Sequence, residues 1–321
     1  MPTEKSAKRP RLLREPHVSD VAVVGHFSVD SILLPSRPHA FMMLGGSVTY
    51  VSLVTKRLDG RASVISKVGG DFPEAYLWWL REEGIDLTSV VKRESEQSTR
   101  FELEYSSDLS ERKLRLKGKA SPITVDDLQS FGHSKALHVA PIAGEISYEV
   151  VEYLKKHTGV LSFDPQGMLR AFDEAGNVYC CAPTDRRLLS LVNVYKSSMD
   201  EVTALTGETE IKPGLKAIHD FGVENVIITL GAKGAVLSVA GSIYNIPACA
   251  GNAVVDPTGA GDVFIGAFLT EYTRAKETFW CACVGSAAAS LVVESLGATS
   301  VGEKEEIYRR AESLYEKGIK Q

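Results

Sequence analysis

The residues with the clearest chemical potential lie together in one stretch, Asp256-Pro257-Thr258-Gly259-Ala260-Gly261-Asp262. Its two glycines can adopt backbone angles that other residues resist, and they let a ligand approach the main chain closely. The apolar pattern that begins at Ala260 predicts a helix, and the first N–H groups of a helix have no partner within it. The N–H groups of residues 259–262, together with the helix dipole, therefore predict a site for a phosphate group.

Asp262 stands at the end of this turn, where a carboxylate can accept a proton from a hydroxyl group. That hydroxyl would then attack a phosphoryl group held on the backbone amides, and phosphoryl transfer needs little beyond positioning, charge neutralisation and such a base. The alternative is a tight turn with an aspartate that caps a helix. Because Gly-x-Gly alone is weak evidence, the remaining segments of the chain must decide between the two interpretations.

Strand and helix patterns alternate along most of the chain. Apolar segments that end in glycine, such as 20–25 and 62–70, alternate with segments of helical periodicity, such as 47–60 and 72–84. This alternation predicts a parallel sheet covered by helices on both faces. The chain closes with three predicted helices, over residues 260–272, 279–296 and 303–320.

A different pattern occupies residues 99–116, where apolar and charged residues alternate on both sides of a polar turn. This alternation predicts a hairpin with one buried face. The apolar members of the hairpin are Phe101, Leu103, Tyr105, Leu114 and Leu116. They either face a partner chain or the substrate, or they pack on the body of the same protein.

The composition is that of a globular protein with one large or two small domains: 321 residues, 44% hydrophobic and 24% charged. The net charge of -5 argues against nucleic acid as the main partner. No apolar run has the length of a membrane span, so we expect no membrane association. The five cysteines show no metal-ligand spacing, so we expect free thiols in a cytoplasmic protein. We expect residues 1–18, which are basic and lack the apolar core of a secretory signal, to form a disordered tail before one domain over 19–321.

The stretch at 256–262 resembles the C-terminal signature of the ribokinase-like (PfkB) carbohydrate kinases, and the resemblance extends from about Asp20 over nearly the whole chain. "GHFSVDSI" resembles the first strand and loop of that family, "LGGSVTYVSLVTKRLDGRASVISKVGGDFP" its N-terminal signature, and "TLGAKGA" its nucleotide-binding turn. The resemblance implies an α/β fold, a three-layer α/β/α sandwich with a mostly parallel central sheet. It also implies a small β-sheet lid, with segments at about 31–44 and 97–118, that can form a homodimer contact.

The resemblance further implies an ATP-dependent kinase that uses Mg²⁺. A monovalent cation such as K⁺, bound in addition to Mg²⁺, is a further expectation from the family. The implied catalytic residues are Asp262, Gly259, Ala260 and Gly261. The implied substrate-binding residues are Asp30, Gly45, Gly46, Gln166 and Arg170. For Gln166 and Arg170 the alternative is a purely structural role in a loop or a surface ion pair. The implied ATP-site residues are Lys196, Ser198, Thr229, Gly231, Lys233, Gly234, Ser286 and Ala289. Glu201 would hold Mg²⁺ through water, and Asp256 would lie beside the monovalent cation.

One departure from the family pattern narrows the substrate. Many members carry Asn-x-x-Glu before a Leu-Thr-Gly helix end, whereas here Ser198 replaces the asparagine and Glu201 keeps the glutamate. A serine can still hydrogen-bond a metal-bound water. The segments "KSSMDE", "DPQGMLR" and "KGKASPI" resemble the inositol-kinase-like branch, which implies myo-inositol or a similar polyol. A ribose, ketose or nucleoside kinase of the same family, and a non-catalytic nucleotide- or sugar-binding sensor on the same fold, stay open as alternatives.

Overall fold

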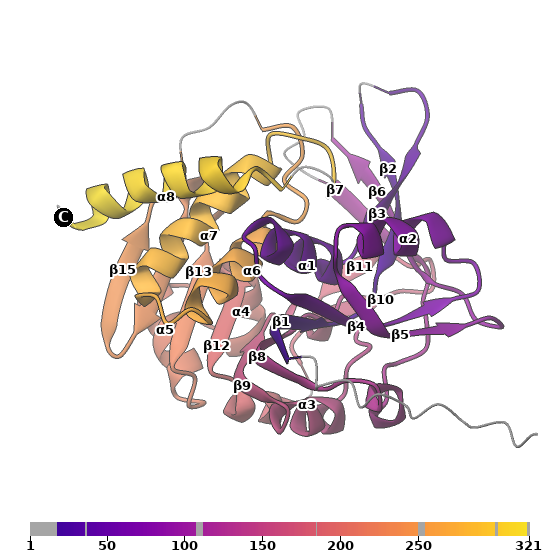
Figure 1. The fold of residues 1–321 in the computed structure, drawn as a ribbon, viewed down its shortest axis with the longest axis horizontal. Helices are drawn as coiled ribbons and strands as arrows, with labels where there is room; N and C mark the ends of the chain where they lie inside the picture. The colour runs from indigo at the N-terminus through magenta and orange to yellow at the C-terminus, as the bar shows by residue number, and fades with distance from the viewer. Residues whose placement is uncertain are drawn as a thin grey trace, which may run out of the picture.

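The computed structural model describes residues 18–35, 37–106, 112–183, 185–249, 254–298 and 301–319. The expected N-terminal tail therefore lies outside the described residues, apart from Val18. The described chain forms a large layered α/β body with a small sheet standing above one end of it (Figure 1).

The large sheet has nine strands. In chain order these are β1 (Val18–Val24), β4 (Ala62–Gly69), β5 (Asp86–Arg93), β8 (His133–Val139), β9 (Thr158–Phe163), β12 (Val194–Ser198), β13 (Asn225–Thr229), β14 (Ala235–Val239) and β15 (Ser242–Ile246). Their order across the sheet is β15-β14-β13-β12-β9-β8-β1-β4-β5. Neighbouring strands from β13 to β5 are parallel, and only the pairs β13–β14 and β14–β15 are antiparallel. The predicted mostly parallel sheet is confirmed.

Helices cover both faces of this sheet, as Figure 1 shows. One face carries α1 (Ser47–Arg57), α2 (Glu74–Glu82), α6 (Ala260–Tyr272), α7 (Thr278–Val292) and α8 (Lys304–Ile319), which share one apolar core with the sheet. The other face carries α3 (Tyr148–Lys155), α4 (Met199–Thr206) and α5 (Ile211–His219), with a second core. Two short 3-10 turns, η1 (Val125–Leu128) and η3 (Arg187–Leu191), join this second layer. The three-layer arrangement follows because a sheet with two apolar faces must be covered twice.

The helix bounds near the C-terminus lie within one residue of the predictions except at the end of α7. Helix α6 begins and ends where the apolar pattern predicts, whereas α7 ends at Val292, four residues before the predicted end. The chain turns there: the N–H of Ser295 donates to the carbonyl of Val292 (3.3 Å), and Gly297 has a φ of 70°. The residue that follows the helix, Val293, keeps a right-handed backbone (φ -71°), and Gly297 adopts its positive φ only further along the turn. The apolar residues beyond Val292 therefore pack from a turn.

The small sheet has four strands in the order β3 (Phe41–Gly45), β2 (Ser28–Leu33), β6 (Thr99–Tyr105) and β7 (Arg112–Gly118). The two segments expected to form a lid thus lie in one sheet, in which β2 and β6 are parallel. The apolar face of the predicted hairpin packs partly on Ile142 and Ala143 of the body. Phe101, Leu103 and Leu114 of the same face also line a pocket.

A short hairpin that the sequence pattern does not predict joins the small sheet to the body. Its strands are β10 (Arg170–Phe172) and β11 (Val178–Cys180), and three-residue strands are too short for an alternating pattern to reveal. The N–H of Leu116 in β7 donates to the carbonyl of Gly176 at the tip of the hairpin (2.8 Å). Arg115 also donates to Asn177 (3.1 Å). The hairpin therefore holds the outer strand of the small sheet.

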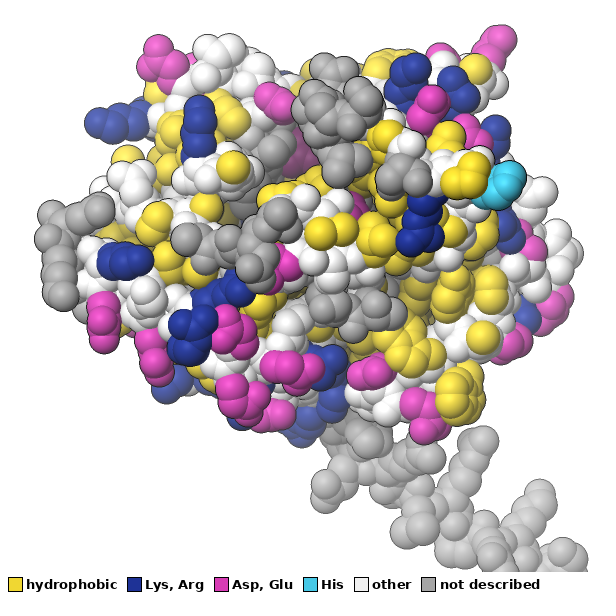
Figure 2. Space-filling view, turned by 90° about the horizontal axis from the view of Figure 1, so that it is seen from above, with side chains coloured by type: hydrophobic (Ala, Val, Ile, Leu, Met, Phe, Trp, Pro, Cys, Tyr) yellow, Lys and Arg dark blue, Asp and Glu magenta, His cyan; other side chains and the backbone are white. Residues whose placement is uncertain are grey.

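No helix among the described residues is long and apolar enough to cross a membrane. On the face seen in Figure 2, basic and acidic side chains of the described residues are interspersed along one edge. No basic patch stands out among them on this face.

Candidate active site

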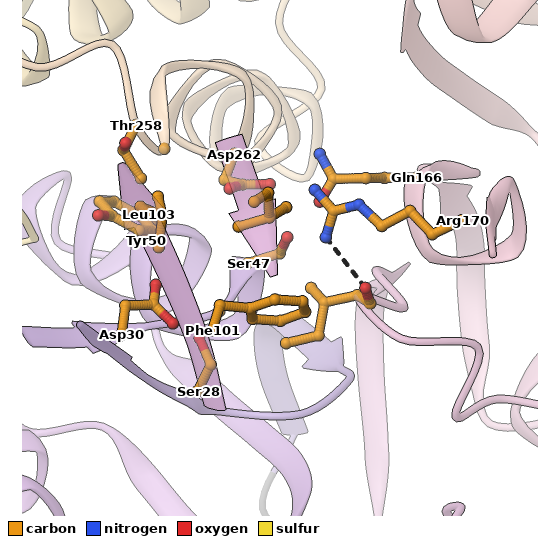
Figure 3. A pocket seen from close by; sticks show the side chains of 14 residues that line it. Ser28, Asp30, Ser47, Tyr50, Phe101, Leu103, Gln166, Arg170, Thr258 and Asp262 are labelled. Atoms are coloured by element: carbon orange, nitrogen blue, oxygen red, sulfur yellow. Dashed lines mark hydrogen bonds between the residues drawn. The ribbon is translucent and has the colours of Figure 1, made fainter. Parts of the chain in front are cut away.

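A pocket lies between the small sheet and the beginning of α6 (Figure 3). Its polar lining side chains are Ser28, Asp30, Ser47, Tyr50, Gln166, Arg170, Thr258 and Asp262. Its apolar wall consists of Phe101, Leu103, Leu114 and Ile142. The segments that follow β1, β8 and β9 supply several of these residues, so the pocket lies at the carboxyl ends of parallel strands, where ligands bind in open α/β sheets.

The turn before α6 has the backbone that the sequence predicts. Gly259 caps the helix with a φ of 79°, and a side chain there would bring its Cβ within 2.4 Å of the Tyr50 ring. A Cβ on Gly261 would lie 2.5 Å from Nζ of Lys196. Position 259 therefore needs glycine, whereas a side chain at 261 would displace the ammonium group of Lys196. One expectation is wrong: the N–H of Ala260 is not unpaired but donates to the carbonyl of Pro257 (3.3 Å), because the turn closes on itself.

Asp262 faces the pocket from the first turn of α6 (Figure 3). Burial raises the pKa of this carboxyl group above its usual range, and Asp164 adds to the rise. Lys196 and a hydrogen bond with Ser47 act in the opposite direction. A carboxylate with a raised pKa is a stronger base than an exposed aspartate, which suits proton transfer from a hydroxyl.

Lys196 forms a buried ion pair with Asp164, with Nζ and Oδ2 2.7 Å apart. Burial alone would lower the pKa of Lys196, but the surrounding carboxylates Asp164, Asp262 and Glu201 raise it above its usual value. Lys196 therefore keeps a positive charge beside the backbone of Gly261. A fixed cation at this place can neutralise a phosphoryl group held on the turn.

Asp164 is a site residue that the sequence analysis does not single out. It follows β9 directly, and burial alone would raise its pKa, but Lys196 holds the pKa of this carboxyl group below the usual value. Its second oxygen accepts the N–H of Gln166 (3.0 Å). Asp164 thus positions both Lys196 and the pocket residue Gln166. The only available signal is its place at the start of the quoted segment "DPQGMLR".

Ser198 and Glu201 form a reciprocal cap at the start of α4. The Ser198 N–H donates to Oε2 of Glu201 (2.7 Å), and the Glu201 N–H donates to the Ser198 hydroxyl (3.3 Å). Burial raises the pKa of Glu201, and Asp164 adds to this, so the negative charge of Glu201 is poorly stabilised. A cation would relieve that cost, and these residues therefore fit the predicted Mg²⁺ position. Among the described residues, no group of three His, Cys, Asp or Glu side chains is arranged to hold an ion directly.

The predicted acceptor residues come from opposite sides of the pocket. Figure 3 shows Asp30 on one side and Gln166 and Arg170 on the other. A Cβ on Gly45 would lie 2.0 Å from Oδ2 of Asp30, so Gly45 makes room for that carboxylate. Gly46, with a φ of 87°, caps α1 and lines the pocket.

Arg170 and Gln166 are held at the pocket rather than left on the surface. Gln166 begins the short turn η2 (Gln166–Met168), and Arg170 begins β10. Nη1 of Arg170 donates to the carbonyl of Ile142 (3.0 Å), and its guanidinium lies 5.7 Å from the centre of the Phe101 ring. Both side chains line the pocket.

Glu145 organises the loop that bears Ile142, and nothing in the sequence pattern marks it. This fully buried carboxylate accepts the N–H groups of His26 (2.9 Å), Ile142 (3.0 Å) and Ala143 (2.8 Å). It thereby joins the segment after β1 to the segment after β8, which are 119 residues apart. A single glutamate in a loop carries no local signal for such a role.

The predicted ATP-site residues that do not line the pocket lie on neighbouring elements. Thr229, at the end of β13, donates to the carbonyl of Ser197 in β12 (3.3 Å). Gly231 and Gly234 have φ of 58° and 92° around the turn η4 (Gly231–Lys233), where Lys233 is exposed. On α7, Ser286 donates to the carbonyl of Pro247 (2.9 Å), and Ala289 packs on the adjoining core. Thr229 and the turn η4 thus lie at the carboxyl end of β13, which pairs with β12, the strand that bears Lys196.

Asp256 is buried and has one oxygen that is hydrogen-bonded and one that is not. Oδ1 accepts from the N–H of Thr258 (2.9 Å) and from the hydroxyl of Tyr105 (3.0 Å). Oδ2 has no hydrogen-bond partner among the described residues. A buried carboxylate oxygen of this kind fits the predicted neighbour of a monovalent cation.

The sequence profile of the pfkB family carbohydrate kinases matches residues 18–305. The chain belongs to this family. A cytidine kinase from Thermococcus kodakarensis is 27% identical over 293 residues, which cover 88% of this chain and 99% of that enzyme. A fructokinase from Vibrio alginolyticus is 28% identical over 268 residues, 80% of this chain and 85% of that enzyme.

Solved structures of the ribokinase family share the fold of this pfkB family kinase. One is a pyrophosphate-dependent kinase complexed with a pyrophosphate analogue and myo-inositol. Its TM-score is 0.77 at 22% identity, and the match covers 90% of this chain and 99% of that one. The ribokinase-like fold and the carbohydrate-kinase class predicted from the sequence are thus confirmed, and the sensor alternative gives way to an enzyme. The acceptor is not fixed, because the relatives act on different ones.

Proposed function

We propose that this pfkB family kinase transfers a phosphoryl group from ATP to a hydroxyl group of a polyol, with myo-inositol as the first acceptor to test. The observation that carries the proposal is one pocket in which a carboxylate base, Asp262, faces a set of polar groups suited to several hydroxyls. Asp30 lies on one side of this pocket, and Gln166 and Arg170 lie on the other.

The proposed reaction needs few protein groups. Asp262 accepts the proton of the acceptor hydroxyl, and the oxygen attacks the terminal phosphorus of ATP. The new O–P bond forms while the bond from phosphorus to the bridging oxygen breaks, and ADP leaves with that oxygen. Lys196 and the backbone N–H groups of Gly259, Gly261 and Asp262 offset the charge on the transferring group.

Two carboxylates would hold the cations. Glu201 would bind Mg²⁺ through water, with the Ser198 hydroxyl beside it, and Asp256 would lie next to a monovalent cation. When bound, Mg²⁺ neutralises charge on the phosphates of ATP. Thr229, Gly231, Lys233 and Gly234 would lie beside the phosphates, with Ser286 and Ala289 near the base.

The lining of the pocket supports a compact ring with many hydroxyls. The polar groups surround the pocket, whereas Phe101 and Leu103 present an apolar wall on which the C–H face of such a ring can rest. Unpaired hydroxyls in a closed site are costly, so several polar partners favour a polyol over a less substituted alcohol. The small sheet, which supplies Phe101 and Leu103, would act as the lid that excludes water. We also infer a reducing, cytoplasmic setting from the cysteine pattern of the sequence.

A nucleoside is the second candidate acceptor, and one observation favours it. The ring of Phe101, with Arg170 close to it, offers a surface on which a nucleobase can stack. The similarity to the cytidine kinase points the same way.

The test is an ADP-release assay with Mg-ATP and a panel of acceptors: myo-inositol, ribose, fructose, fructose 6-phosphate, cytidine and adenosine. Pyrophosphate replaces ATP in a parallel series with phosphate release as the readout. Turnover on myo-inositol at least about ten-fold above the others supports the proposal, since that ratio corresponds to about 1.4 kcal/mol of transition-state discrimination. Turnover confined to nucleosides would replace the polyol by the second candidate.

A further inference from the structure

A chain of hydrogen bonds runs from the small sheet to the phosphate-binding turn. Tyr105 is the last residue of β6, and its side chain is buried. Its hydroxyl donates to Oδ1 of Asp256 (3.0 Å) and lies 2.7 Å from the Thr258 hydroxyl. Because the tyrosine proton goes to the carboxylate, the threonine must donate to the tyrosine oxygen. The order of donation is therefore Thr258 to Tyr105 to Asp256.

The segment that Tyr105 contacts determines the course of the turn. Asp256 is tied to the body through its own N–H, which donates to the carbonyl of Val293 (3.2 Å). It is tied to the next residues through Oδ1, which also accepts the Thr258 N–H (2.9 Å). Gly259 follows at once, in its left-handed conformation against the Tyr50 ring. Tyr105 thus adds a link from a separate sheet to a turn otherwise fixed by the body.

We propose that Tyr105 is a positioning residue that couples the docking of the small sheet to the shape of the turn at 256–259. When β6 lies against the body, its tyrosine holds Asp256 and Thr258, and these hold the N–H groups that face the transferring phosphoryl. When β6 moves away, the turn loses two side-chain hydrogen bonds. Closure over the acceptor, on one side of the pocket, thereby completes the phosphate-binding side. This coupling deepens the proposed kinase function and rests on it.

The experiment compares wild-type protein with Tyr105→Phe, which keeps the ring and removes the hydroxyl. The first readout is amide hydrogen exchange of ligand-free protein in the peptide that covers residues 254–264. We expect the exchange rate there to rise about ten-fold, because loss of a hydrogen bond to a carboxylate raises the population of locally opened states by about this factor. Exchange in peptides of α3 should stay unchanged. Tyr179→Phe is the control, since Tyr179 is 53% exposed.

The second readout is steady-state kinetics with Mg-ATP and the best acceptor of the panel. We expect kcat of Tyr105→Phe to fall about ten-fold, with the acceptor KM within about three-fold of wild type, because the turn acts in the transition state and not in acceptor binding. Thr258→Val removes the first donor of the chain and should raise exchange in the same peptide, which covers the case that Tyr105→Phe folds poorly.

Each outcome of these experiments either supports or overturns the coupling. Unchanged exchange at 254–264 in both variants overturns the coupling, as does exchange that rises equally in every peptide. A rise confined to 254–264 together with the loss in kcat supports it. A confined rise in a protein that phosphorylates none of the acceptors supports the link between Tyr105 and the turn and overturns the proposed acceptors instead.

Discussion

At the scale of single residues, the site concentrates carboxylates around one ammonium group. Asp164, Glu201 and Asp262 all influence Lys196, and Lys196 in turn moderates the raised pKa of Asp262. This mutual dependence means that a change at one position should be visible in the titration of another.

The pH dependence of kcat/KM should report Asp262. The reaction needs the ionised carboxylate, and burial raises its pKa above the usual aspartate value of 3.8, so activity should fall on the acid side at a pH above that value. Lys196→Met removes the group that lowers this pKa, so the acid limb should move to higher pH. Lys216→Met is the control, because Lys216 forms an exposed ion pair with Asp220. An acid limb at the same pH in all three proteins would contradict this assignment.

The same burial should cost stability. A carboxyl group with a pKa higher in the folded than in the unfolded state favours folding when protonated, and this contribution is lost as pH rises through the folded-state pKa. At neutral pH the ionised Asp262 therefore disfavours the folded state. Asp262→Asn should raise Tm by about 2 °C at pH 7, and the gain should shrink towards pH 4. Thermal melts at the two pH values measure it, and a lower Tm at pH 7 would show that the charge is stabilised after all.

At the scale of elements, the glycine turns connect sequence and site. Gly259 and Gly222 both have positive φ, 79° and 96°, but only at Gly259 would a Cβ meet another group, the Tyr50 ring. Comparing the two positions separates backbone strain from steric collision.

Gly259→Ala should lower the free energy of unfolding by about 3 kcal/mol, whereas Gly222→Ala should cost only about 1 kcal/mol for its left-handed backbone. Gly259→Ala should also abolish most activity, since the turn at 256–262 would shift. Urea unfolding and the ADP-release assay measure the two effects. Equal losses of stability in the two variants would mean that the contact with Tyr50 relaxes without cost.

Sequence patterns predict the elements well where the signal is local. The bounds of α6 follow from an apolar run after a glycine turn, and the hairpin of β6 and β7 follows from alternation over 99–116. The hairpin of β10 and β11 is not predicted, because its strands are three residues long and its stability comes from β7. The role of Arg170 at the pocket depends on that hairpin and could only be implied by resemblance.

At the scale of the whole molecule, contacts between distant segments assemble the site. Tyr105 and Asp256 are 151 residues apart, and His26 and Glu145 are 119 apart. Spacing within a motif says nothing of such pairs, so Asp164, Glu145 and Tyr105 emerge as site residues only when the fold is known. The alternation of strand and helix patterns, by contrast, predicts the parallel sheet with helices on both faces.

The attachment of the small sheet to the body should control acceptor binding. A Cβ on Gly176 would lie 2.2 Å from the carbonyl oxygen of Leu116, so Gly176→Ala should separate the hairpin from β7. We expect the acceptor KM to rise about ten-fold, because the pocket loses one of its supports, while the KM for ATP changes little. Gly241→Ala is a matched control: Gly241 has the same φ of 80° as Gly176, but a Cβ on Gly241 would have no atom within 4 Å. Equal rises in both KM values would contradict a role confined to the acceptor side.

The most direct test of the central claim is the turnover of Asp262→Asn with Mg-ATP and the best acceptor, measured as ADP release beside the wild-type enzyme. The asparagine keeps the shape of the side chain but cannot accept the proton. We predict a fall in kcat of about 10³-fold, with binding of ATP retained. A kcat within a factor of about two of wild type would show that Asp262 is not the base and that another group activates the hydroxyl.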